Sequence, residues 1–135
     1  MHLEILRTSP WFFKALDHLF PATAVALWPF ILVRDVEYLK LPAVLNHERI
    51  HHAQQRELLV LPMVLIYWVL VAYWWIRSGS LQEAYLHSPF EQEAYENEQN
   101  LIYLMTRPRW AWTSYMRPNP RVLAWKELHP GERIK

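Results

Sequence analysis

The stretch His47-Glu48-Arg49-Ile50-His51 is an HExxH motif, and it decides the fold and the chemistry expected of this chain. Residues four apart in a helix share a face, so the imidazoles of His47 and His51 can bind one metal ion. Glu48 lies one residue off that face, where its carboxylate can act as a general base on a water molecule. The motif therefore predicts a helix that carries a zinc site and its base.

The alternative is a helix with two histidines on a solvated face. An apolar lead-in at 41–45, with a proline early in the expected helix, favours a buried helix instead. His52 diverges by about 100° from its neighbour, so we expect it to face solvent or substrate. Gln54 and Gln55 are expected either to fix the helix packing or to touch substrate.

A catalytic zinc site usually has three protein ligands, so the motif needs a third. A metzincin pattern would place it at Glu57, but Gln54 stands where that pattern needs a glycine to turn the chain. We therefore expect Glu57 to point away. His87 is a further candidate, because it directly precedes the next helix expected along the chain.

Residues 88–98 read as that second helix. Ser88 is a natural N-cap, Pro89 suits the first turn, and the acidic residues suit the positive helix end. Glu91 and Glu93 are both candidates for the third ligand, with Glu91 favoured. The alternative for this stretch is a solvated acidic helix face.

The HExxHxxQQ run, followed downstream by Phe90-Glu91-Gln92-Glu93-Ala94-Tyr95, resembles a small, largely uncharacterised family of bacterial zincin-like proteins. In these motifs it is similar to the gluzincin metallopeptidases, which complete the site with the glutamate of Glu-x-x-Ala-Asp or Glu-x-x-Ser-Asp. The resemblance implies Zn²⁺ on His47, His51 and Glu91. Tyr95 replaces the aspartate that would hold a zinc-binding histidine. With Glu93 as ligand instead, Asn97 would take that supporting place.

The function implied is hydrolysis of a peptide bond in a peptide or protein substrate, by zinc-dependent metallopeptidase chemistry. Glu48 would take the proton of the attacking water and pass it to the leaving amine. Tyr95, Tyr85 and His87 are the candidates for the donor that stabilises the oxyanion. A lipid or a small amide is an alternative substrate.

Length and composition predict one domain over residues 1–135. The resemblance implies that it is mainly α: a minimal zincin-like domain with two metal helices and a short β-strand or hairpin before the first. There is no cysteine, which excludes thiolate ligands. The net charge of +1 and the scattered basic residues give no reason to expect nucleic acid as a partner. An oligomer stays open.

Residues 58–76 contain no charge and end in Tyr73, Trp74 and Trp75 before Arg77, a pattern typical of a membrane span. A single span of about 30 Å would separate His51 from Glu91, which metal bonds of about 2 Å cannot bridge. We therefore expect a helix that is buried in the core, in an oligomer or in a membrane interface, bent away by Pro62. The alternative is a non-catalytic membrane protein that spans at 58–76, with a structural metal or none.

The apolar stretch 20–33 is split by two prolines. Its residues 24–33 can form a strand that ends at Arg34-Asp35, and zincin-type enzymes bind peptide along such an edge strand. The competing interpretation is a membrane-inserted helical hairpin. Lys14 and Asp17 argue against a secretory signal, so we expect a membrane-associated or cytoplasmic bacterial protein.

Overall fold

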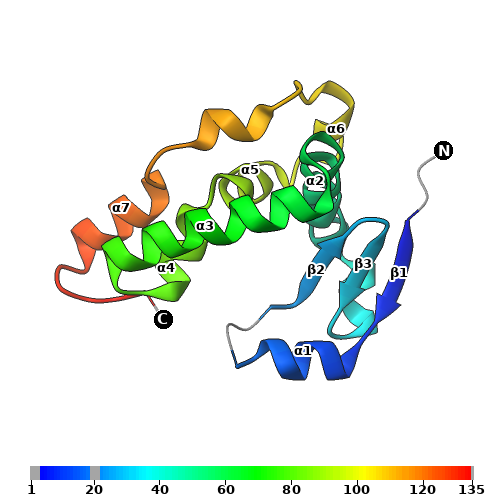
Figure 1. Cartoon of the computed structure of the whole chain (residues 1–135), viewed down its shortest axis with the longest axis horizontal. Helices are drawn as coiled ribbons and strands as arrows, with labels where there is room; N and C mark the ends of the chain where they lie inside the picture. Colours follow the sequence, from blue (N-terminus) through cyan, green and yellow to red (C-terminus); the bar gives the residue numbers. More distant parts are fainter. Residues whose placement is uncertain (1–3, 19–21, 135) are drawn as a thin grey trace.

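The computed structural model describes residues 4–18 and 22–134, and it is mainly helical with one small sheet (Figure 1). This confirms the mainly α fold with a hairpin before the motif helix. The elements are β1 (Ile5–Thr8), α1 (Pro10–Leu16), β2 (Ala24–Leu27), β3 (Phe30–Val33), the 3₁₀ turn η1 (Val36–Lys40), α2 (Pro42–Leu58), α3 (Val60–Ser78), α4 (Leu81–His87), α5 (Pro89–Asn97), α6 (Tyr103–Thr106), the 3₁₀ turn η2 (Ala111–Tyr115) and α7 (Pro120–Leu128).

The sheet has the strand order β1-β3-β2, with β1 parallel and β2 antiparallel to β3. Side chains of β3 alternate, with Ile31 and Val33 buried in the core. The stretch 24–33 is thus a β-hairpin turning at Trp28-Pro29, neither one continuous strand nor a helical hairpin. Residues 20 and 21 of the wider stretch lie outside the described residues. Strand β2 forms an edge of the sheet and packs on α2.

Helix α2 begins at Pro42 as expected, because proline at the first helical position lacks only an N–H that would be unpaired there. It ends at Leu59, whose φ of 65° breaks the helix before α3. The expected bend at Pro62 is wrong: Pro62 lies in the first turn of α3, where backbone N–H groups have no partner within the helix.

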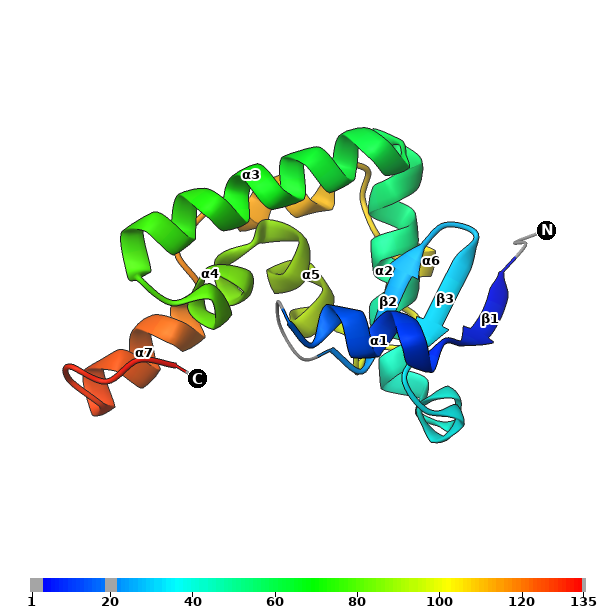
Figure 2. The same cartoon turned by 60° about the horizontal axis from the view of Figure 1, so that its bottom comes forward.

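The chain turns back after α3. Gly79 ends α3 with a φ of 71°, and the Ser80 hydroxyl caps α4 by accepting from the Glu83 N–H. Helices α4 and α5 then return along one side of α3 (Figure 2). Helix α5 starts at Ser88 and Pro89 as predicted, although the Ser88 hydroxyl makes no capping bond. The return brings α5 against α2, so α3 does not separate the two motifs.

Helix α3 is the one helix in the described part of the chain that is long and apolar enough to cross a membrane, with a mean hydropathy of 1.6. Only 11% of the apolar stretch of this helix is buried inside the protein. The expectation that 58–76 would be buried in the core of this chain is therefore wrong for most of the helix. Helix α2 is the reverse case, since most of its buried side chains are polar.

Candidate metal centre

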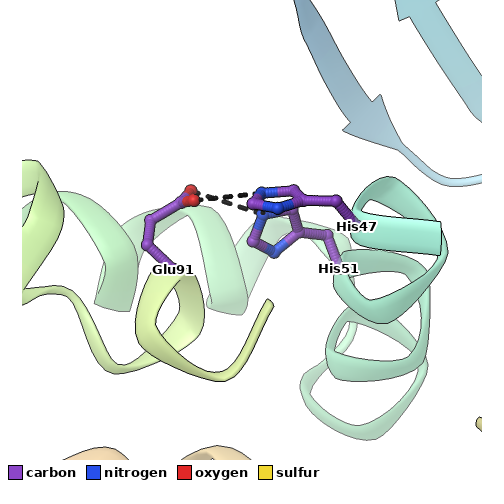
Figure 3. A group of neighbouring side chains, drawn as sticks. All are labelled: His47, His51 and Glu91. Atoms are coloured by element: carbon purple, nitrogen blue, oxygen red, sulfur yellow. Dashed lines mark hydrogen bonds and ion pairs between the residues drawn. The ribbon is translucent and has the colours of Figure 1, made fainter. Parts of the chain in front are cut away.

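Three side chains from two helices meet at one point: His47 and His51 of α2, and Glu91 of α5 (Figure 3). The two Nε2 atoms lie 3.2 Å apart. Glu91 places one carboxylate oxygen 3.2 Å from Nε2 of His47 and the other 3.3 Å from Nε2 of His51. All three residues are buried, and together they could hold a metal ion.

Both histidines are fixed from behind through their other ring nitrogen. Nδ1 of His47 donates to the Glu98 carboxylate at 2.8 Å, and Nδ1 of His51 donates to the Gln54 side-chain oxygen at 2.8 Å. Each bond orients the ring and selects the tautomer whose Nε2 has a free lone pair. The imidazoles are thereby prepared as metal ligands.

The charges of the cluster are strongly coupled. Burial lowers the pKa of His47, but its hydrogen bonds to Glu91 and Glu98 outweigh that effect and raise the pKa to about 10. Burial of His51 is likewise outweighed by the charge of Glu91, so its pKa is also raised. In return, the histidines hold the pKa of Glu91 well below its ordinary value despite burial. A divalent cation would replace these protons, so metal binding should weaken as the pH falls.

Glu48 lies beside the cluster and faces a cavity of about 230 Å³. The cavity is lined by residues of α1, β2, α2, α3, α4 and α5, and its walls are mostly apolar. Burial raises the pKa of the Glu48 carboxyl, against the opposing charges of His51 and His47 and a backbone hydrogen bond from Ala26 of β2. A carboxyl with a raised pKa next to a metal site fits a general base that works near neutral pH.

Two phenols touch the third ligand. The Tyr67 hydroxyl donates to one oxygen of Glu91 at 3.1 Å, and the Tyr85 hydroxyl donates to the other at 2.9 Å. Both residues line the cavity. Tyr95 instead packs its ring on His47 and bonds Tyr85 through its hydroxyl at 3.2 Å. The Tyr67 and Tyr85 hydroxyls therefore hold the Glu91 carboxylate in place, and each has its single proton engaged there.

The structure leaves other candidate residues outside the cluster. The Glu93 carboxylate accepts hydrogen bonds from Arg107, Tyr103 and Gln54. Asn97 donates to the Glu93 carbonyl and to the Tyr115 hydroxyl.

The His87 ring stacks on Trp74, and its Nδ1 accepts a hydrogen bond from the Asn119 N–H at 2.9 Å. Its Nε2 faces Glu83, so the ring does not join the three candidate ligands. The expectation that His52 faces solvent or substrate is wrong, because it is buried and its Nε2 donates to the Phe30 carbonyl of β3 at 2.9 Å. The two glutamines after it fix packing, Gln54 behind His51 and Gln55 on the backbone of β2.

Tyr67 and Glu98 were not among the site residues predicted from the sequence. Tyr67 stands in the middle of the apolar run 58–76, and a phenol at that position was the one signal pointing to it. Glu98 follows Glu91 by seven residues, a spacing that brings it to the same side of α5 but matches no gluzincin motif.

Comparisons with family models, curated proteins and solved structures give no significant match for this chain. Its chemistry therefore has to be inferred from the site itself.

Proposed function

We propose that this chain is a zinc-dependent hydrolase of the gluzincin metallopeptidase type, which acts at a membrane on peptide bonds. The observation that carries the proposal is the convergence of the candidate ligand atoms: the two Nε2 atoms lie 3.2 Å apart, and each lies 3.2–3.3 Å from one of the two oxygens of Glu91. Ligand atoms about 2.0–2.2 Å from zinc in a tetrahedral site lie about 3.3–3.6 Å apart. Two imidazoles and one carboxylate are also the ligand set of many catalytic zinc sites, which keep a fourth position open.

Each residue at the site has its own role in the proposed hydrolysis. Glu48 takes a proton from the attacking water and delivers it to the leaving amine. Tyr85 and Tyr67 orient the Glu91 carboxylate through the hydrogen bonds that their hydroxyls donate to it. Zinc, when bound, supplies a Lewis acid that polarises the carbonyl and acidifies the water. Apolar cavity walls exclude bulk water, which strengthens these charge interactions.

An extended substrate segment would pair with the outer edge of β2, the strand next to α2. Gln55 already binds the Ala26 carbonyl at 2.9 Å and the Trp28 N–H at 2.7 Å. Substrate would therefore pair further along the strand, toward Ala24, which also lines the cavity. Glu48 lies between this edge and the metal ligands, where a scissile bond would have to be.

Glu98 supports the site through His47, and replacing it tests this arrangement. Glu98→Ala is expected to lower the affinity for Zn²⁺ by about 10–100-fold, because His47 loses the partner that orients it. Competition with a coloured chelator measures the affinity. Glu96→Ala is the matched control, since Glu96 is exposed and pairs only loosely with Arg117 at 3.8 Å. Equal affinities in the two variants would contradict the role of Glu98.

The test of the function is cleavage of a mixed peptide library by the zinc-loaded chain, read by mass spectrometry as new peptide ends. The same incubation with Glu48→Gln and with chelated protein shows whether the cleavage belongs to this site. Metal-dependent cleavage that requires Glu48 supports the proposal. The second candidate, a non-catalytic protein that spans a membrane through α3, is favoured by the apolar composition of that helix and predicts no cleavage.

A further inference from the structure

Helix α3 has two opposite faces. The inner face carries Met63, Tyr67 and Val71, which pack toward the site and the core. At 100° per residue, most of the exposed side chains fall on the opposite side of the helix, and Trp68 and Trp75 lie at its flanks. The exposed side chains are all apolar or aromatic within the uncharged run: Leu61, Leu65, Trp68, Val69, Tyr73, Trp75 and Ile76. We call this set the outer face of α3.

Figure 2 shows α3 along the upper side of the protein, with α4 and α5 below it and no helix or strand above it. An apolar helix face of this length is unusual on a protein surface and marks an interaction site. The charges at its ends indicate the partner. Arg56 lies just before the helix and Arg77 at its end, with its guanidinium 5.6 Å from the centre of the Tyr73 ring. Arg133 lies close to Gly79 at the same end.

Apolar side chains between arginines, with Trp and Tyr near the end, match an anionic lipid surface: acyl chains beneath and phosphates at both ends. A span through the bilayer fits this chain less well. Tyr67, at the midpoint of α3, contacts Glu91 of α5. Helix α5 also carries Glu96, which forms an exposed ion pair with Arg117. Spanning would put those charges at bilayer depth, which is costly.

We propose that the outer face of α3 lies in the surface of an anionic bilayer, so that the catalytic cavity receives substrates that are themselves anchored in the membrane. The substrate class rests on the proposed function, whereas the docking does not. Trp68 links the two, because it belongs to the outer face and also lines the cavity. Phe12 of α1 lines the opposite wall, and its neighbour Trp11 is exposed. An amphiphilic substrate could thus pass from lipid to the site along apolar side chains.

Vesicle flotation tests the docking with two matched double variants of the full chain. Val69→Glu with Ile76→Glu changes the outer face at side chains that are 68% and 85% exposed. Met105→Glu with Leu128→Glu adds the same charge at residues 85% and 79% exposed, on α6 and α7 away from that face (Figure 2). With vesicles of roughly one-third anionic lipid, the first variant should partition at least about tenfold less than wild type and the second should not.

Other results overturn the docking. If both variants bind vesicles equally well, the outer face of α3 is not the docking surface. If both variants lose binding, the binding reflects only general surface hydrophobicity. A wild-type chain that binds no vesicle but forms a dimer disrupted by Val69→Glu with Ile76→Glu would assign the face to a second copy. Zinc content is measured on the same samples. If the wild type binds vesicles but contains no zinc, the docking proposal is supported and the proposed zinc-hydrolase function is refuted.

The substrate class is tested with a library-derived cleavable peptide, either free or linked to a lipid in the same vesicles. We expect the anchored form to be cleaved about tenfold faster at equal bulk concentration, because docking raises its effective concentration at the site. That advantage should disappear in Val69→Glu with Ile76→Glu, while cleavage of the free peptide stays. Equal rates for both forms by the wild type would overturn the membrane-anchored class.

Discussion

Replacing Glu48 by glutamine is expected to lower kcat/KM for peptide cleavage by about 10²–10⁴-fold while zinc stays bound. Glutamine keeps the size of the side chain but cannot accept the proton of the attacking water. The candidate metal ligands His47, His51 and Glu91 are untouched, so the variant separates catalysis from metal binding. The measurement is the initial rate on a peptide that the wild type cleaves, with zinc content determined on the same protein.

Glu37→Gln is the matched control, because Glu37 is exposed and pairs with Lys40 on the surface. It should behave as wild type. The pH dependence adds an independent check. Burial raises the pKa of Glu48, so activity at zinc concentrations that keep the site filled should fall as the pH drops through that raised pKa. This acidic limb should be absent from any residual activity of Glu48→Gln under the same conditions. Full activity in Glu48→Gln would refute the proposed base.

Replacing Glu93 by alanine is expected to destabilise the fold by about 3–5 kcal/mol, because it leaves a buried arginine without one partner. Glu93 is fully buried, and Arg107 binds it through Nε and a terminal nitrogen. Arg107 would keep only the Glu57 carboxylate, at 2.7 Å. The measurement is the free energy of unfolding from urea denaturation of the metal-free protein.

Glu96→Ala, at the exposed side of the same helix, is the control and should change that free energy by less than about 1 kcal/mol. If Glu93→Ala is too unstable to purify, Glu93→Gln keeps the bond to the Tyr103 hydroxyl and allows the same comparison. A Glu93 variant with wild-type stability would contradict the structural role.

Helices α2 and α5 could be predicted because their signals are local in the sequence. The i, i+4 spacing of His47 and His51 needs only helix geometry, and Ser88-Pro89 marks the start of α5 within the sequence itself. Glu91 could be favoured over Glu93 from the motif. The reason for the choice appeared only in the structure, where Arg107 occupies Glu93 from a position distant along the chain.

The features that could not be predicted depend on contacts between distant segments. The supporting role of Glu98 requires α5 to cross α2 in one register, and its motif position is unlike the expected aspartate. Tyr67 reaches Glu91 only because the chain returns along α3 after Gly79. The parallel pairing of β1 with β3 and the burial of His52 under that sheet likewise follow from tertiary packing.

The most direct test of the metal centre is zinc content by elemental mass spectrometry, on protein purified without added metal. Wild type and Glu91→Ala are compared, with Glu96→Ala as control. We expect close to one zinc per chain in wild type and control, and loss of the zinc in Glu91→Ala, since that variant keeps only two of the three proposed ligands. A wild-type chain that holds no zinc even after zinc is supplied would contradict the proposed zinc centre. A Glu91→Ala variant that keeps its zinc fully would contradict it as well.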